Sequence, residues 1–319
     1  MTTMRAAAID RFGGPEVLTI HELPVPKISA QEVLVAIDTA GVGMWDVRVR
    51  AGKWAEREEF PMILGTDASG VIAESGAQVK RLKRGDRVYA YSYGNAKGGF
   101  YAGYVAVAAS KVAPIPRTLD MLPAGGLATI GLTALQGVDD TLQIKPGENV
   151  IIHGASGNVG MLALQFAKLR GARVLATATG SDGLDLVRRL GADRSVDGKK
   201  DEIVEAAREF APQGVDAVLA FVGGKALTQC LDALRKGGRA AYPNGVEPEP
   251  RKRKGVRIKS YDGTPGVREF ERLNRAVEEA ELQVPIAAGF KLEEACDAHR
   301  MMERGHIIGK VVLRVNVKG

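Results

Sequence analysis

The residues that most strongly suggest chemistry form a glycine-rich loop, Gly154-Ala155-Ser156-Gly157-Asn158-Val159-Gly160. An apolar strand-like segment (148–152) precedes the loop, and apolar residues at helical spacing (161–169) follow it. Such a loop is typical of a site that binds the pyrophosphate of a dinucleotide. Gly157 lets the phosphates approach the main chain, Gly160 lets the helix pack closely, and the N–H groups at the helix start attract the anion. We therefore predict cofactor contacts from Ser156, Gly157, Asn158 and Val159, with a plain strand–helix turn as the alternative.

The segment after the second strand indicates which dinucleotide is bound. An NAD site usually carries Asp or Glu about 20 residues beyond the glycines, where it binds the ribose 2′-hydroxyl. Here the strand ends in Thr177-Ala178-Thr179-Gly180-Ser181, with no carboxylate. Small hydroxyl side chains leave room for a 2′-phosphate and can donate hydrogen bonds to it. We expect NADPH, bound by Thr177, Thr179 and Ser181; a small error of register would bring Asp182 to the ribose and favour NADH.

Two patterns of secondary structure divide the chain. Short alternating runs with frequent turns, such as 32–37 and 70–73, predict a partly open antiparallel barrel in residues 1–118. From about residue 148, strands alternate with helices, which predicts βαβ units and a parallel sheet. The predicted fold is α/β, with an antiparallel barrel catalytic domain (1–121 and 266–319) and a doubly wound Rossmann domain that binds NADPH (122–265).

The composition excludes several classes of protein. The two cysteines, Cys230 and Cys296, cannot form a disulfide framework or a thiolate zinc site, and they fit a reducing cytoplasm. The first residues lack a long apolar segment, so we expect no signal peptide, and no apolar run is long enough to span a membrane. The net charge of +6 favours anionic ligands without requiring nucleic acid. A basic cluster at 251–254 is interpreted as a solvated loop, with an anion or RNA patch as the alternative.

A set of motifs runs through nearly the whole chain and resembles the medium-chain dehydrogenase/reductases. The motifs are Gly41-Val42 followed by Asp46, Leu64-Gly65-Thr66-Asp67-Ala68-Ser69-Gly70, Gly85-Asp86-Arg87-Val88, Gly131-Leu132-Thr133-Ala134-Leu135, the 154–160 loop, Leu190-Gly191-Ala192-Asp193 and Gly309-Lys310-Val311-Val312-Leu313. The resemblance implies a GroES-like catalytic domain beside a Rossmann domain, with the cofactor in the cleft between them. It also implies a homodimer.

The resemblance further implies that no metal is bound. Zinc-containing relatives carry Cys-His where this chain has Gly43-Met44, and His-Glu where it has Thr66-Asp67. Their third cysteine would lie near Ala128-Thr129. Zinc needs thiolate, imidazole or carboxylate ligands in a tetrahedron, which Asp67 alone cannot make. This places the chain with the zinc-free quinone oxidoreductases and enone reductases.

In those relatives a threonine of the Gly-Leu-Thr segment helps to hold the nicotinamide, and Thr133 matches it; the alternative is a helix-interior threonine that bonds back to the helix's own carbonyls. Thr133 and Trp54 are the candidate catalytic residues. Met44, Trp45 and Trp54 can shape an apolar substrate pocket, or belong to the core. The loops after the fourth and fifth strands flank the nicotinamide in relatives and contribute Val222, Gly223, Pro243, Asn244, Gly245 and Val246. Their alternative role is that of simple turns.

The predicted function is the NADPH-dependent transfer of hydride, without a metal, to a quinone or an α,β-unsaturated carbonyl. The chain's task is then to position the reactants, exclude water and stabilise developing charge on oxygen. The alternatives are an enoyl-thioester reductase and a non-catalytic NADPH-sensing or RNA-binding protein of the same fold. We expect a small-molecule electron acceptor as partner, and neither a membrane nor a nucleic acid. His153 is interpreted as a packed residue at a strand end.

Overall fold

The computed structural model describes residues 2–56 and 58–315. The chain forms two compact units. The first contains the described residues of Met1–Thr129, Pro265–Arg275 and Val284–Gly319, and the second contains Ile130–Thr264 and Ala276–Gln283. The predicted domains, which assign a catalytic and a cofactor-binding role, stay a prediction.

The first unit is built around a seven-stranded sheet with the order β15-β16-β3-β5-β6-β8, in which β7 also pairs with β3. All pairs are antiparallel except β15–β16. A second sheet has the order β2-β1-β4. The strands are β1 (Thr3–Ile9), β2 (Leu18–Pro24), β3 (Glu32–Val42), β4 (Met62–Ile63), β5 (Asp67–Ser75), β6 (Arg87–Tyr91), β7 (Tyr104–Ala108), β8 (Val112–Pro114), β15 (Ile286–Lys291) and β16 (Lys310–Arg314).

Alternating burial explains why these segments pair as strands. In β3, Val33, Val35 and Ile37 are almost completely buried, and they join an apolar core with residues of β5, β7 and β16. Strands with one buried face prefer this period of two. The helices of this unit are short: α1 (Met44–Arg50), α2 (Met121–Gly125), α9 (Ala295–Arg304), and the 3-10 turns η1 (Pro15–Val17), η2 (Ala109–Lys111) and η4 (Leu292–Glu294).

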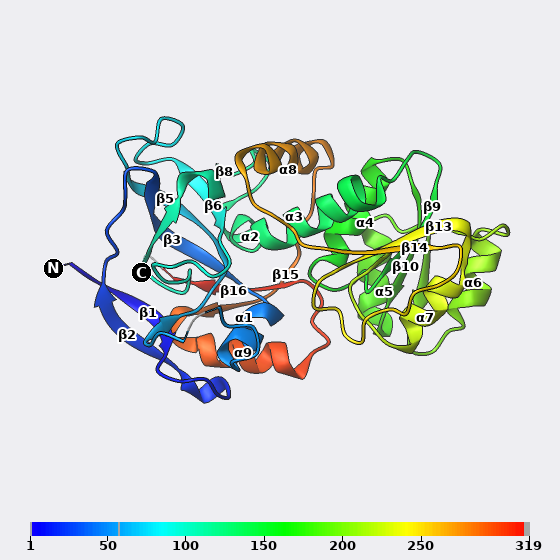
Figure 1. The fold of residues 1–319 in the computed structure, drawn as a ribbon, viewed down its shortest axis with the longest axis horizontal. Coiled ribbons are helices and arrows are strands. Elements are labelled where there is room, and N and C mark those ends of the chain that lie inside the picture. Colours follow the sequence, from blue (N-terminus) through cyan, green and yellow to red (C-terminus); the bar gives the residue numbers. More distant parts are fainter. Residues whose placement is uncertain (1, 57, 316–319) are drawn as a thin grey trace. The chain divides into compact units, whose positions relative to one another are not determined.

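The second unit contains a six-stranded parallel sheet with the order β11-β10-β9-β12-β13-β14 (Figure 1). The strands are β9 (Asn149–His153), β10 (Arg173–Ala178), β11 (Arg194–Asp197), β12 (Val215–Ala220), β13 (Leu234–Pro243) and β14 (Arg257–Tyr261). Numbered from β9, the order is 3-2-1-4-5-6, which defines the doubly wound dinucleotide-binding sheet. The predicted α/β fold, an antiparallel GroES-like part and a Rossmann part, is therefore confirmed.

Helices connect the parallel strands and pack along the sheet (Figure 1). They are α4 (Gly160–Leu169), α5 (Gly180–Arg189), α6 (Ile203–Phe210) and α7 (Lys225–Asp232). In α6 the buried residues Ile203, Ala206, Ala207 and Phe210 recur at helical spacing and face the core. The remaining helical segments are α3 (Ala128–Gln136), the π-helical turn η3 (Gly137–Leu142) and α8 (Val267–Glu279).

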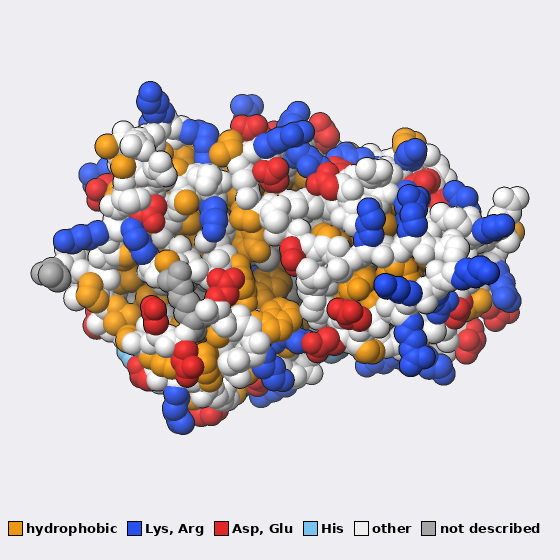
Figure 2. Space-filling model, viewed as in Figure 1, with side chains coloured by type: hydrophobic (Ala, Val, Ile, Leu, Met, Phe, Trp, Pro, Cys, Tyr) orange, Lys and Arg blue, Asp and Glu red, His pale blue; other side chains and the backbone are white. Residues whose placement is uncertain are grey.

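Surface charge and helix length bear on the expected partners. Figure 2 shows lysine and arginine side chains interspersed with acidic ones over the visible face, consistent with a modest net charge. Of the helices in residues 2–56 and 58–315, none combines the length and the apolar character that crossing a bilayer requires.

Candidate active site

Four loops of the second unit meet at one edge of the parallel sheet. His153, the last residue of β9, is in register with Thr177 of β10 and with Ala220 of β12. Because the strands are parallel, the loops that follow them leave the sheet at the same edge. The strand order reverses between β9 and β12, and open α/β sheets bind their ligands outside the carboxyl ends of the strands at such a point.

The loop between β9 and α4 has the backbone shape that its glycines predict. Gly154 has a φ of +77°, which favours glycine. A Cβ on Gly160 would lie 2.2 Å from the carbonyl oxygen of Gly154, so any side chain here would push α4 away from the loop. A Cβ on Gly157 would meet only that same oxygen, at 3.3 Å. Apart from that one close contact, the space beside Gly157 is open, as the approach of a phosphate to the main chain requires.

The hydroxyl of Thr177 holds the start of this loop in place through hydrogen bonds. It accepts the backbone N–H of Gly154 at 3.0 Å and lies 2.7 Å from Nδ1 of His153. The side chain of Thr177 is 1% exposed, and its main-chain carbonyl accepts the N–H of Ala155. Its hydroxyl is thus engaged within the protein, and we assign Thr177 to ordering the loop instead of binding the 2′-phosphate directly.

Ser156, Asn158 and Val159 all lie in the loop, as the sequence implies. Ser156 is buried beside the first turn of α5, where a Cβ on Gly183 would lie 3.2 Å from its hydroxyl oxygen. Oδ1 of Asn158 is buried and has no hydrogen-bond partner among the described residues. An unpaired buried amide oxygen is costly unless a ligand supplies a donor. The open space at Gly157 and this orphaned amide together fit a bound dinucleotide.

The predicted adenosine end follows β10. Thr179 is half-buried and precedes α5, and Ser181 is exposed in its first turn. The Oδ1 atom of Asp182 accepts the N–H of Gly183 at 2.8 Å, within that turn. The neighbouring strand brings another carboxylate, Asp197, whose two oxygens accept the N–H groups of Gly180 and Lys199. The acids near this end are therefore engaged by backbone donors.

The structure places two lysines here that the sequence interpretation did not select. Lys199 and Lys200 follow β11, are exposed, and belong to the loop whose Gly198 N–H bonds to the carbonyl of Ala178. That loop therefore lies beside the end of β10. Arg188, on the neighbouring helix α5, pairs with Asp185 on the same helix.

The loops after β12 and β13 contact each other and the glycine loop. Val222 is 53% exposed, and its Cγ2 atom would lie 2.8 Å from a Cβ on Gly154. A Cβ on Gly223 would lie 2.4 Å from the carbonyl oxygen of Glu247. Of the segment Pro243–Val246, Gly245 has a φ of +90° and Val246 is buried in the core. The side-chain amide of Asn244 donates a hydrogen bond to Asp262 at 2.7 Å, so the residue that directly follows β14 holds this side chain in place.

Thr133 lies in α3 beside the loop that follows β14. Its carbonyl oxygen accepts the hydroxyl of Tyr261 at 2.9 Å, and a Cβ on Gly263 would lie 2.5 Å from its hydroxyl oxygen. Thr133 is half-buried. It belongs to the same unit as the glycine loop, whereas the other catalytic candidate, Trp54, belongs to the first unit.

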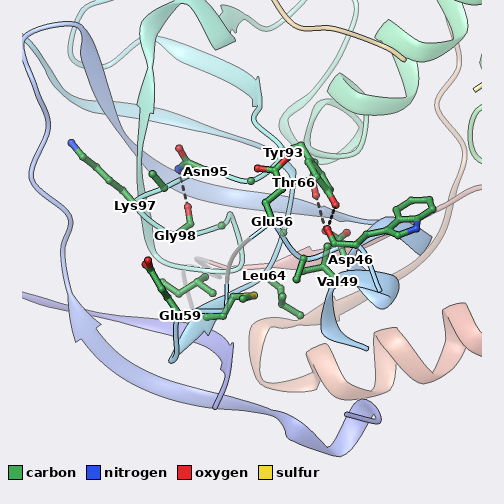
Figure 3. Close-up of a pocket in the computed structure, with 18 of the residues that line it drawn as sticks. Asp46, Val49, Glu56, Glu59, Leu64, Thr66, Tyr93, Asn95, Lys97 and Gly98 are labelled. Carbon is green, nitrogen blue, oxygen red and sulfur yellow. Dashed lines mark hydrogen bonds between the residues drawn. The ribbon is translucent and has the colours of Figure 1, made fainter. Parts of the chain in front are cut away.

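The first unit holds a pocket of about 420 Å³ (Figure 3). Trp54 lines it, and the guanidinium of Arg48 lies 4.6 Å from the centroid of the Trp54 ring. One wall is apolar and consists of Val49, Phe60, Pro61, Met62, Ile63 and Leu64. The polar lining includes Asp46, Thr66 and Tyr93. Burial, Glu56 and Asp46 raise the pKa of Tyr93 to about 12, so its hydroxyl stays protonated.

Comparison with known proteins agrees with this architecture. A model described as an alcohol dehydrogenase GroES-like domain matches residues 29–117, and one described as a zinc-binding dehydrogenase matches residues 190–313. The quinone oxidoreductase of Lama guanicoe is 30% identical over 323 residues, which cover 97% of both chains. The chain belongs to the medium-chain dehydrogenase/reductase family. It is an oxidoreductase of this family and is similar to its quinone oxidoreductases.

Members of the family with solved structures differ in cofactor. The solved structure of an NAD-dependent alcohol dehydrogenase is 31% identical, has a TM-score of 0.91, and is matched over 98% of this chain and 100% of its own. The mycobacterial protein Rv1454c, complexed with NADPH, is 26% identical with a TM-score of 0.86, over 98% and 99% of the chains. The family therefore supports a nicotinamide cofactor but leaves the choice between NADPH and NADH to this chain's own residues.

The positions that hold zinc in other members of the family carry different side chains here. Among residues 2–56 and 58–315, no three His, Cys, Asp or Glu side chains come close enough to hold a metal ion. Oδ2 of Asp67 accepts the N–H of Thr129 at 3.0 Å. The ring of Trp45 fills the space that a side chain at Gly43 would take, with a Cβ there only 2.1 Å from the ring. The donor set does not fit a tetrahedral zinc site, and zinc independence stays a prediction.

Proposed function

We propose that this chain is an NADPH-dependent reductase that transfers hydride to a quinone or an α,β-unsaturated carbonyl without a metal. The observation that carries the proposal is the open glycine loop at the edge of the parallel sheet. Small hydroxyls at Thr179 and Ser181, together with Lys199 and Lys200 in the adjoining loop, favour the phosphate of NADPH over the bare ribose of NADH. The likeness to quinone oxidoreductases supports the acceptor class.

The residues of the second unit would hold the cofactor, which supplies the hydride when bound. The loop of Ser156, Gly157, Asn158 and Val159 offers main-chain N–H groups and the Asn158 amide. Thr133 and the loops that begin at Val222 and Pro243 would position the reactive end. A positioned reactant gains much of its rate from orientation alone. Trp54 would form part of the acceptor site.

The pocket of the first unit suits a neutral, flat acceptor. Its apolar wall can bury a ring, and burial of apolar area contributes roughly 25 cal/mol per Å². The described lining also carries the exposed carboxyl groups of Glu56 and Glu59, while Lys97 is paired with Glu32. Such a lining disfavours strongly anionic substrates, which argues for a quinone or enone over an enoyl thioester of an anionic carrier.

The proposal is tested with purified protein, NADPH and NADH side by side, and a panel of quinones, enones and enoyl thioesters. We expect quinone- or enone-dependent loss of the reduced nicotinamide absorbance, with NADPH preferred in kcat/KM. Selective reduction of enoyl thioesters would favour the alternative reductase. Tight NADPH binding with no acceptor reduced would favour a non-catalytic sensor, to be examined further by RNA binding of a variant in which residues 251–254 are alanine.

The cellular setting follows from the same proposal and stays a prediction. We expect a cytoplasmic homodimer that works on a small-molecule acceptor. Gel filtration with light scattering measures the oligomeric state directly.

A further inference from the structure

A buried hydrogen-bond network adjoins the pocket of the first unit. Asp46, in α1, is 2% exposed, and it lines the pocket together with Thr66 (Figure 3). Its Oδ1 atom accepts the hydroxyl of Thr66 at 2.7 Å. Its Oδ2 atom accepts the N–H of Gly43 at 2.8 Å and the hydroxyl of Tyr101 at 3.2 Å. Oδ1 of Asp46 thus bonds to the pocket-lining residue Thr66, and Oδ2 bonds to groups in the protein interior.

The hydrogen-bond directions on the interior side are fixed by Arg50. Its guanidinium, which only donates, lies 3.3 Å from Nδ1 of His299, so that nitrogen accepts. Burial and the charge of Arg50 lower the pKa of His299 to about 3, and the ring is therefore neutral with its proton on Nε2. Nε2–H then donates to the oxygen of Tyr101 at 3.3 Å. The Tyr101 hydroxyl must donate onward to Oδ2 of Asp46.

This order leaves one place for a proton on Asp46. Oδ2 already accepts hydrogen bonds from two donors, the N–H of Gly43 and the hydroxyl of Tyr101. A proton on Oδ2 would therefore be repelled by the hydrogens of both donors. Oδ1 faces only Thr66, and a threonine hydroxyl can turn from donor to acceptor. A protonated Asp46 therefore carries its proton on Oδ1 and points it at Thr66. Thr66, which lines the pocket, can then donate its own hydroxyl hydrogen to an acceptor bound there.

The charges around Asp46 allow both protonation states near neutral pH. Burial is the main cause that raises its pKa to about 7. Repulsion from Asp67 also raises the pKa, whereas the bonds from Thr66 and Gly43 and the charge of Lys310 lower it. Glu56 and Tyr93 also line this pocket, whereas Tyr101 is fully buried on the interior side of Asp46. A carboxyl group with such a pKa is suited to give and regain a proton at working pH.

We propose that Asp46 supplies, through Thr66, the proton that the acceptor's oxygen takes up after hydride transfer. The Oγ1–H bond of Thr66 breaks as a new O–H bond forms on the reduced acceptor, whose oxygen carried the negative charge. The Oδ1–H bond of Asp46 breaks as Thr66 regains its proton, and Asp46 becomes a carboxylate. Water reprotonates Asp46, so each hydride delivered consumes one proton from solvent. The step rests on the proposed function, because that function creates the oxyanion.

The first experiment is a pH profile of kcat with saturating NADPH and a quinone. Wild type should lose activity above about pH 7, where Asp46 is ionised. Asp46→Asn keeps the shape of the side chain but should lower kcat about 10²-fold and remove this inflection. Thr66→Val should behave likewise, whereas Thr66→Ser, which retains the hydroxyl, should keep both rate and profile.

A second readout does not depend on turnover. Infrared difference spectra of the ligand-free protein between pH 5 and pH 9 should show a carboxylic acid band that disappears with a midpoint near 7 in wild type. The same band should be missing from Asp46→Asn. A folded Asp46→Asn enzyme with an unchanged pH profile, or a wild-type spectrum without this band, overturns the role of Asp46 and leaves the proposed function standing. If wild type reduces no acceptor at all, the proposed function is wrong and the inference falls with it.

Discussion

The ammonium group of Lys310 lies 4.8 Å from the centroid of the Trp45 ring and has no hydrogen-bond partner among the described residues. The Lys310 side chain is fully buried. The unpaired Oδ1 atom of Asp67 lies close by, since the Cβ position of Gly41 is 2.4 Å from that oxygen and 3.0 Å from Cε of Lys310. The ring therefore contributes a cation–π attraction to this buried cation, beside the nearby carboxyl group of Asp67.

This relationship predicts energetic coupling between the two side chains. Trp45→Leu removes the ring, and Lys310→Met removes the charge while keeping the length of the side chain. Each variant should be destabilised, but the double variant should lose less than the sum, by about 1 to 2 kcal/mol. Urea unfolding followed by circular dichroism measures the three free energies. Strict additivity would mean that the ring does not stabilise the cation.

The glycine loop offers a matched pair of substitutions. Gly160→Ala places a Cβ 2.2 Å from a backbone oxygen, so it should distort the loop, lower the melting temperature and weaken cofactor binding together. Gly157→Ala meets nothing closer than 3.3 Å, so the fold should persist while the phosphates lose their approach. We expect at least a tenfold rise in the NADPH dissociation constant for Gly157→Ala at an unchanged melting temperature. Calorimetric titration measures the dissociation constant, and thermal melts measure the stability. If Gly157→Ala binds NADPH as tightly as wild type, the phosphates do not approach the main chain at Gly157.

Signals that lie close together in the sequence were enough to predict the parallel half of the fold. The alternation of apolar strands and amphipathic helices from residue 148 onward gave the βαβ order, and the strand–loop–helix pattern gave the position of Gly154–Gly160 in space. The interpretation of His153 as a packed residue at a strand end is confirmed, because it is 4% exposed beside Thr177. These features depend on neighbouring residues, whose spacing is visible in one sequence.

Features that depend on distant pairs could not be predicted. Nothing local indicates that the hydroxyl of Thr177 turns inward to Gly154, or that Lys199 lies beside the end of β10. Asp46, Tyr101 and His299 come from an early helix, a loop and a late helix, and only the folded barrel brings them together. The burial of His299 against Arg50 is a contact between residues far apart in the sequence, so no local pattern predicts it.

The lysines beside β10 predict how cofactor preference responds to mutation. Lys199→Ala combined with Lys200→Ala should raise the KM for NADPH about tenfold, because the 2′-phosphate loses charge-assisted contacts, while the KM for NADH stays within a factor of two. Arg188→Ala is the control, since this arginine is paired with Asp185 and should leave both constants unchanged. Equal losses with both cofactors would place the lysines away from the 2′-phosphate.

The buried imidazole of His153 predicts acid sensitivity of the second unit. Burial lowers the pKa of His153 to about 4, from an ordinary value of 6.5. Below pH 6.5 the unfolded chain binds a proton that the folded ring refuses, so the free energy of unfolding falls until the pH reaches about 4. His153→Asn keeps an atom near Nδ1 without titrating. The stability advantage of wild type over this variant should shrink by about 3 kcal/mol between pH 7 and pH 4. Urea unfolding of both proteins at several pH values measures this difference, and a constant difference would show that the ring titrates alike in the folded and unfolded chains.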